Sequence, residues 1–131
     1  MAILDASVVV EILLRTDAGR VALRLIATER QGVHAPHLLD IEVMYALRRL
    51  VLKQELSRQE AETAVEFLPQ LQIMRHAHVL LLPRIWALRE AITAYDAAYV
   101  ALAEILDLPL WTCDAKLSRS HGHRAKIVLL T

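Results

Sequence analysis

The chain has 131 residues, of which 15 are basic and 15 are acidic, so its formal net charge is zero. This balance excludes a role that depends on a global excess of positive charge, and any affinity for nucleic acid must come from where the charges lie. Hydrophobic residues make up 56% of the sequence, yet the longest apolar runs, such as residues 79–82, are too short to span a bilayer.

The length fits a single domain that covers residues 1–131. The lone cysteine, Cys113, excludes an internal disulfide and fits a reducing cytosol. The N-terminus has no basic segment followed by a small-residue cleavage site, so we expect a soluble cytoplasmic protein that is not exported. The high apolar share favours elements covered on both faces, or an apolar surface for a partner.

The first half of the chain predicts two strands and four helices. Pro36 is expected to open the third helix, because proline is tolerated at a first helical position. Ser57 and Glu60 form a capping-box pattern that opens the fourth helix. Pro69 closes that helix. The first expected strand ends at Asp5, and the second covers 33–35. The expected helices cover 8–14, 17–30, 36 to about 54, and 57 to about 68.

The second half alternates short apolar runs with helical patterns. Pro83 must either lie in the first turn of one expected helix, where proline is tolerated, or shift the start of that helix to its own position. The expected strands cover 72–75, 110–113 and 126–130, and the expected helices cover 78–90 and 94–106. Strands that alternate with helices indicate a mostly parallel sheet covered on both faces. The predicted fold is a three-layer α/β/α sandwich.

Four acidic residues lie where this fold would bring them together. Asp5 and Asp114 each follow an apolar strand, and such strand ends meet at one edge of a parallel sheet. Glu42 and Asp96 lie near helix N-termini with apolar neighbours three and four residues away. A carboxylate on an apolar face must be paired, hydrogen-bonded or bound to metal. Asp5 has a second interpretation, as the N-terminal cap of the helix that follows it.

Four converging carboxylates would repel one another unless a cation joined them. A set of carboxylates without matched histidine or cysteine ligands suits Mg²⁺ or Mn²⁺. Such ions favour hydrolysis of phosphoryl esters by an activated water molecule. The residues therefore predict metal-dependent hydrolysis of a phosphoryl ester, with no side chain required as a covalent nucleophile.

The order of these acids and their neighbours resembles the PIN domains, and among them the VapC-type toxins of toxin–antitoxin pairs. The likeness covers essentially the whole chain and rests on four stretches. These are Leu4-Asp5-Ala6-Ser7, Glu42-Val43 with Ala46-Leu47-Arg48-Arg49, residues 93–103, and residues 110–117.

This resemblance implies a Mg²⁺- or Mn²⁺-dependent endoribonuclease with Asp5, Glu42, Asp96 and Asp114 as its acidic site. It also implies auxiliary polar roles for Ser7 and Thr112, a homodimer, and an antitoxin partner that blocks the acidic site with a basic side chain. Some relatives carry a further acid shortly after the fourth one. Here residues 115–118 contain none, which leaves a fifth ligand in doubt.

Other residues allow competing interpretations. Asp40 competes with Glu42, because its own helical neighbours are also apolar. The histidine pairs at 76/78 and 121/123 suggest zinc, but they lack a matching ligand set, so exposed loop histidines are favoured. Tyr95 and Tyr99 fit packing in the core or at a dimer contact better than base stacking. The C-terminal cations Lys116, Arg119 and Arg124 form either a clamp for RNA phosphates or an ordinary solvated tail.

Two rival functions remain open at this point. The first is a non-catalytic module that binds RNA and holds a structural cation with the same acids. The second is a phosphatase with Asp5 as its nucleophile. That chemistry requires a general acid two residues further on, where this sequence has Ser7.

Overall fold

Five short strands form the centre of the molecule in the computed structural model, which describes residues 1–28 and 32–131. They are β1 (Ala2–Leu4), β2 (Val33–Pro36), β3 (Ile73–His76), β4 (Leu110–Thr112) and β5 (Ile127–Leu129). Their spatial order is β3-β2-β1-β4-β5, and each neighbouring pair is parallel. Every residue of β1, β2 and β4 is buried. Short apolar strands therefore suffice, because helices cover both faces of the sheet.

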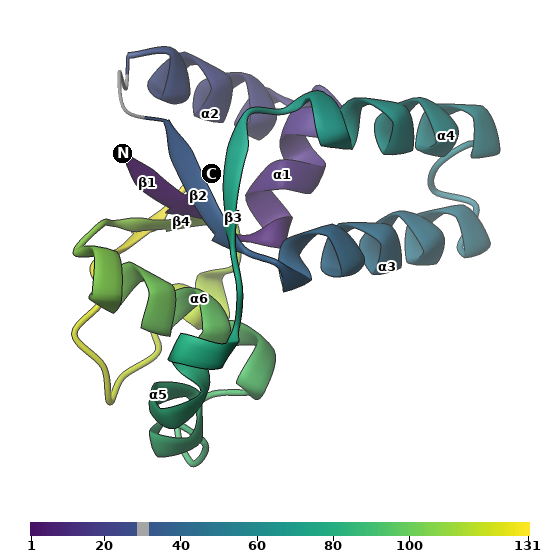
Figure 1. The fold of residues 1–131 in the computed structure, drawn as a ribbon. Coiled ribbons are helices and arrows are strands. Elements are labelled where there is room, and N and C mark those ends of the chain that lie inside the picture. Colours follow the sequence, from purple (N-terminus) through teal and green to yellow (C-terminus); the bar gives the residue numbers. More distant parts are fainter. Residues whose placement is uncertain (29–31) are drawn as a thin grey trace.

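The helices lie on both sides of this sheet (Figure 1). They are α1 (Ala6–Leu13), α2 (Asp17–Ala27), α3 (Leu38–Leu52), α4 (Arg58–Phe67), α5 (Leu82–Ala87), α6 (Ala94–Leu106) and α7 (Ala115–Ser118), with short 3₁₀ turns η1 (Leu68–Gln70) and η2 (Val79–Leu81). In Figure 1, α1 and α2 lie on one side, and α5 and α6 on the other. The hairpin of α3 and α4 projects beyond the sheet. This arrangement confirms the predicted α/β/α sandwich.

Helix α6 is the most buried helix in the described part of the chain. All residues from Ala97 to Ala103 are buried, and the helix packs against β1 and β2. Its many alanines allow the helix backbone to approach the sheet closely. Thr93 caps the N-terminus by accepting a hydrogen bond from the Asp96 N–H at 3.2 Å. The alanine-rich core helix and its cap thus hold Asp96 at the carboxyl edge of the sheet.

Several predicted boundaries in the first half differ from the structure. The first helix covers Ala6–Leu13 rather than 8–14. The second helix ends at Ala27 rather than Arg30, and residues 29–31 lie outside the described part of the chain. Pro36 is the last residue of β2 and does not open a helix. The reason is a long-range contact, because the His37 N–H donates to the His76 carbonyl at 2.8 Å and keeps the chain extended. Helix α3 starts at Leu38, two residues later than predicted.

The second half also shows differences. The third strand is shifted by one residue, to 73–76, and the expected helix 78–90 is divided into η2 and α5, which ends at Ala87. Pro83 lies in the first turn of α5, as expected. The capping box of Ser57 and Glu60 is confirmed. The short helix α7, capped by Asp114, was not predicted. No helix in the described residues has the length and apolar character needed to cross a membrane.

Candidate active site

The four predicted acids share one cleft of about 560 Å³. Asp5 directly follows β1, and Asp114 lies two residues after β4, its parallel neighbour. Glu42 lies in the second turn of α3, and Asp96 in the first turn of α6. Two strand ends and two helix N-terminal segments therefore bring the acids together. The convergence expected at the carboxyl edge of the sheet is present.

Asp5 is both a helix cap and a cleft residue. Its side chain is buried, with 6% of the residue exposed. Oδ1 accepts hydrogen bonds from the Val8 N–H, at 3.2 Å, and from the Ser7 hydroxyl, while Oδ2 accepts one from the Thr112 hydroxyl. Both interpretations of Asp5 therefore describe the same residue. Because each carboxylate oxygen can accept twice, Oδ2 keeps one acceptor position for a ligand.

Two hydroxyl groups tie Asp5 to the loop after β4. Ser7 Oγ accepts a hydrogen bond from the Cys113 N–H at 2.9 Å, and Thr112 Oγ1 accepts one from the Asp114 N–H at 2.9 Å. Each hydroxyl therefore receives a backbone proton and donates its own proton to Asp5. These contacts give Ser7 and Thr112 a specific task, which is to hold Asp5 and the backbone of Asp114 in fixed relative positions.

Glu42 is held by a tyrosine that the sequence analysis assigned only to packing. The Tyr99 hydroxyl donates to Glu42 Oε1 at 2.6 Å, and Tyr99 is 1% exposed. Burial and the nearby Glu42 carboxylate raise the pKa of Tyr99 far above its ordinary value, so the hydroxyl stays protonated and remains a donor. Packing in the core is confirmed for Tyr99, whereas Tyr95 is 64% exposed and does not belong to the core.

The site favours a positive ligand on electrostatic grounds. Burial raises the pKa of Asp5, of Glu42 and of Asp96 above their ordinary values. Neighbouring acids add to each shift, with Asp96 acting on Asp5 and Glu42, and Asp114 acting on Asp96. Each charge makes ionisation of the others harder. A cation in the cleft would reverse this penalty.

The donor set fits a hard divalent ion. Among the residues that the structure describes, no three carboxylate, imidazole or thiol groups already lie close enough to hold a metal. Mg²⁺ does not need such a cage, because it keeps several water ligands and binds through one or two carboxylates. One or two of Asp5, Asp96 and Asp114 would supply oxygen ligands directly and the others would act through bound water, with Glu42 lining the same cleft.

Comparison with known proteins assigns the family. The PIN domain family model matches residues 2–121 of this chain. The chain belongs to the PIN domain family. Ribonuclease VapC12 of Mycobacterium tuberculosis is 42% identical over 130 residues, which cover 99% of each protein. Ribonuclease VapC1 of the same organism is 43% identical over 129 residues, covering 98% of this chain and 96% of that protein.

Solved structures share the fold of this PIN domain at lower identity. The crystal structure of VapBC2 from Rickettsia felis, bound to a DNA fragment from their promoter, has a TM-score of 0.69 and 16% identity, with 99% of this chain and 98% of that chain covered. A toxin–antitoxin complex from Klebsiella pneumoniae has a TM-score of 0.64 and 18% identity, with 98% and 96% covered. At these identities the likeness establishes the fold.

The structure of this PIN domain separates Glu42 from its competitor Asp40. Asp40 forms an ion pair with Arg75, whose Nε and Nη2 donate to the carboxylate at 2.8 Å. It does not line the cleft, whereas Glu42 does. Two residues along a helix point in different directions, so one acid faces β3 and the other faces the carboxylate cluster.

Most histidines of the two predicted pairs form side-chain contacts that the sequence did not predict. The Nε2 atom of His76 lies 2.9 Å from Nδ1 of His34, and Nε2 of His78 accepts a hydrogen bond from the Leu38 N–H at 3.0 Å. His123 Nε2 lies 2.8 Å from the Ser120 hydroxyl. The expectation of exposed loop histidines therefore holds for His121 alone. His78 and His123 lie in loops as expected but are half-buried, and His76 belongs to β3. Their exposure was wrongly predicted, because their partners lie far away in sequence or fold back across a turn.

The basic residues of the PIN domain divide into separate groups. Lys116 and Arg119 line a second hollow that also includes Asp96. Arg124 instead lies beside Glu104, whose carboxylate accepts from the Arg124 N–H at 2.8 Å. Glu104 is eight residues after Asp96, or about 12 Å along α6, so the structure does not unite Arg124 with the other two cations.

Three charged residues of the cleft were not predicted to line it. Glu11 comes from α1, Arg49 from the second half of α3, and Lys53 is the residue that caps the end of α3. A signal for the two cations exists in the sequence, because Glu42, Arg49 and Lys53 are spaced seven and four residues apart, which places them on one helix face.

Proposed function

We propose that this PIN domain is a Mg²⁺- or Mn²⁺-dependent endoribonuclease that acts as the toxin of a toxin–antitoxin pair. The observation that carries the proposal is the convergence of Asp5, Glu42, Asp96 and Asp114 on one cleft. Two relatives that match nearly the whole chain are named ribonucleases, which supports RNA as the substrate.

The residues around the cleft divide the work of hydrolysis. A bound Mg²⁺ or Mn²⁺ supplies charge neutralisation at the scissile phosphate and lowers the pKa of a water molecule. Asp5 offers a fixed oxygen, because three hydrogen bonds hold its carboxylate. Glu42 keeps Oε2 for the cleft while Tyr99 occupies Oε1. The Ser7 hydroxyl is engaged in holding Asp5 and the Cys113 N–H, and the proposal takes water as the nucleophile.

The geometry argues against the phosphatase alternative. An aspartyl nucleophile of this kind works with a general acid two residues later in the sequence. The position two residues later is Ser7, whose hydroxyl is already engaged with Asp5 and with the Cys113 N–H. The non-catalytic alternative uses the same acids and is separated by an assay for cleavage.

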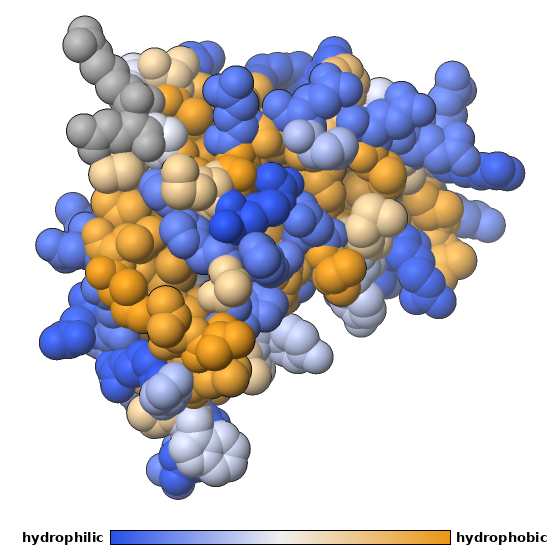
Figure 2. All heavy atoms as spheres, viewed as in Figure 1, coloured by the Kyte–Doolittle hydropathy of each residue, from blue (hydrophilic) through white to orange (hydrophobic). Residues whose placement is uncertain are grey.

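Two protein partners belong to the proposal, an antitoxin and a second copy of the chain. An antitoxin that inserts a basic side chain among the four carboxylates would satisfy their charge and exclude substrate. Five apolar side chains are exposed between β3 and α5, namely Met74, Val79, Leu80, Leu82 and Trp86. Figure 2 shows apolar surface in this region. Exposed apolar area of this kind supports a protein interface.

Light scattering of the purified chain tests the homodimer. We expect a mass of two chains at micromolar concentration, and a mass of one chain contradicts the homodimer while leaving the nuclease proposal intact.

Circular single-stranded RNA tests the nuclease proposal. A pool of circles is incubated with the protein in Mg²⁺, in Mn²⁺ or in EDTA. Since circles have no ends, conversion to linear RNA requires internal cleavage. We expect linear products with either ion and none in EDTA. Binding of the circles without any linear product in either ion would favour the non-catalytic module.

A further inference from the structure

The carboxylate cleft has a positively charged end that the proposed hydrolysis does not use. Arg49 and Lys53 line the cleft together with the acids. Within residues 1–28 and 32–131, neither side chain forms an ion pair. Arg49 lies over the ring of Tyr45, with 5.8 Å between the guanidinium carbon and the ring centroid. By contrast, Arg75 and Arg84 are paired with carboxylates at 2.8 and 2.7 Å.

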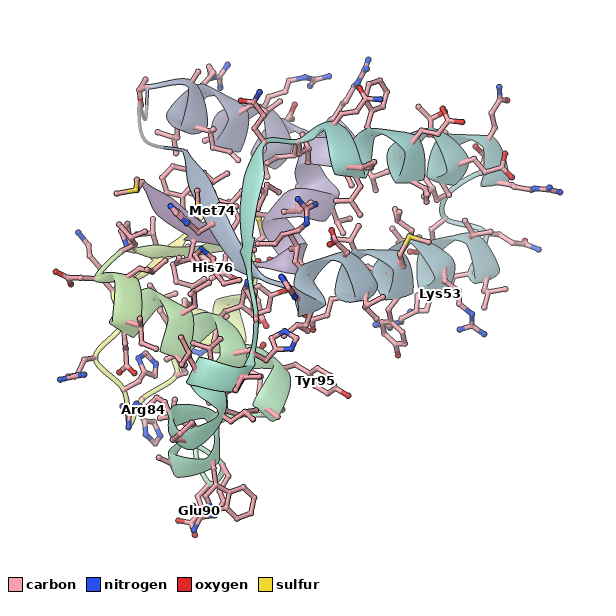
Figure 3. All side chains as sticks on the ribbon, viewed as in Figure 1. Lys53, Met74, His76, Arg84, Glu90 and Tyr95 are labelled. Carbon is pink, nitrogen blue, oxygen red and sulfur yellow. The ribbon has the colours of Figure 1, made fainter. Side chains whose placement is uncertain are left out.

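Distance along α3 explains why these cations do not neutralise the acids. With a rise of 1.5 Å per residue, Arg49 lies about 10 Å from Glu42 along the helix axis, and Lys53 about 16 Å. Figure 3 shows Lys53 toward the outer end of α3, and Tyr95 at the start of α6. The cleft therefore has an acidic end against the sheet and a basic end on the projecting helix. A ligand that contacts both ends must extend well beyond the carboxylates.

A second group of cations lies next to the acids. Lys116, Arg119 and His121 line a hollow of about 490 Å³, and Asp96 belongs both to this hollow and to the carboxylate cleft. The acids therefore adjoin cations of the α3 segment in one hollow and cations of α7 and the residues that follow it in the other. This arrangement matches a polyanion that crosses the carboxylates and continues in both directions.

We propose that Arg49 and Lys53 form a binding site for backbone phosphates of the RNA strand, on the side of the scissile bond opposite Lys116 and Arg119. This inference rests on the proposed function, because it takes the scissile phosphate to lie at the four acids. Phosphate contacts of this kind are independent of sequence and set the position of the strand. A strand held on both sides is cut internally, which gives a structural reason for endonucleolytic cleavage.

The helix dipole offers a simpler explanation for Arg49 and Lys53 than a phosphate-binding site. Cations in the last turns of a helix interact favourably with its dipole without binding anything. Arg48 provides the matched control, because it lies next to Arg49 on the same turn but lines the apolar groove between α3 and α4. A dipole effect would be the same for both arginines, whereas a phosphate site would depend on Arg49.

Fluorescence anisotropy with a labelled single-stranded RNA tests the site. The protein carries Asp96→Asn so that the RNA stays intact, and the variants are Arg49→Gln with Lys53→Gln, and Arg48→Gln alone. We expect the double variant to bind about tenfold more weakly in moderate salt, and the salt slope to fall by about 0.7 for each lost contact. Arg48→Gln should leave the affinity and the salt slope unchanged. Equal affinity of the double variant and its parent, or an equal loss in Arg48→Gln, would overturn the phosphate site.

Cleavage kinetics of the same substitutions in the otherwise native chain separate this inference from the proposed function. We expect KM to rise in the Arg49→Gln, Lys53→Gln variant while kcat stays near that of the native chain, since the lost contacts lie away from the scissile bond. Native protein that cuts RNA, together with an unchanged KM in the double variant, would refute the phosphate site alone. Native protein that binds RNA but never cuts it would refute the proposed nuclease instead.

Discussion

At the scale of single residues, Tyr99 has the most specific role in the site, because its hydroxyl fixes one oxygen of Glu42 at 2.6 Å. Tyr99→Phe removes this hydrogen bond but keeps the buried ring. We expect Mn²⁺ affinity, measured by calorimetry, to fall several-fold, because Glu42 loses its fixed orientation.

Tyr95→Phe is the matched control for this substitution. Tyr95 lies one turn earlier on α6 and is 64% exposed, so the loss of its hydroxyl should leave Mn²⁺ affinity unchanged. An equal affinity in Tyr99→Phe and the native chain would show that the hydrogen bond does not position Glu42 for the ion.

The raised pKa values predict how metal-free stability depends on pH. Asp96 has a folded-state pKa above its ordinary value of 3.8, so the folded chain binds more protons than the unfolded chain. Stability is therefore greatest below the ordinary pKa and falls as the pH rises through the raised one. Asp96→Asn cannot ionise, so we expect it to melt at a higher temperature than the native chain near pH 7 in EDTA. This advantage should shrink toward pH 3, and an advantage independent of pH would contradict the assigned cause.

Residue types and spacing predicted the four acids, but not the contacts that hold them. Asp5 and Asp114 could be placed because parallel strand ends must meet at one edge. The hydrogen bond between Tyr99 and Glu42 joins residues that are 57 positions apart, and local periodicity contains no information about such a pair. The choice between Asp40 and Glu42 likewise depended on Arg75, a residue on a different strand.

At the scale of elements, the start of α3 depends on a distant cap. His37 occupies the N-cap position without a side-chain hydrogen bond, and His78 instead accepts from the Leu38 N–H. His78→Ala leaves this amide without its partner. We expect the free energy of unfolding to fall by about 0.5–2 kcal/mol, as for other lost N-terminal caps, measured by urea denaturation. The exposed His121→Ala is the control, and an equal change in both variants would argue against the cap.

The crossing of α1 and α2 depends on Gly19. A Cβ atom at this position would overlap the backbone carbonyl of Glu11, so the two helices would have to separate. In an isolated helix, alanine is more favourable than glycine by about 1 kcal/mol. We expect the opposite sign here, with Gly19→Ala losing about 1–3 kcal/mol of unfolding free energy. A variant as stable as the native chain in urea would show that the helices do not pack so closely.

Helices marked by their own capping residues or composition were predicted well. Boundaries set by contacts with residues distant in sequence were not. The capping box of α4 and the alanine-rich α6 were found from their own residues. The end of β2 at Pro36 was missed, because the hydrogen bond of the next residue to His76 decides it. Helix α7 is only four residues long and is too short to show a helical period.

At the scale of the whole molecule, the fold divides its functions between the sheet and the projecting helices. The buried sheet fixes Asp5 and positions the loop of Asp114, whereas α3 extends from the acids to the cations at its outer end. A formal net charge of zero therefore conceals strong local separation of charge. Composition excluded a globally basic protein but had no power to exclude a local phosphate-binding surface.

Cleavage of RNA in Mn²⁺ by three chains tests the central claim most directly. The chains are the native protein, Glu42→Gln and Asp40→Asn, which differ by one acid on the same helix. Because Glu42 lines the carboxylate cleft and Asp40 pairs with Arg75, we predict a loss of about a hundredfold or more in rate for Glu42→Gln. Asp40→Asn should keep most of the native rate. Full activity in Glu42→Gln would contradict the claim that the carboxylates of this cleft carry the reaction.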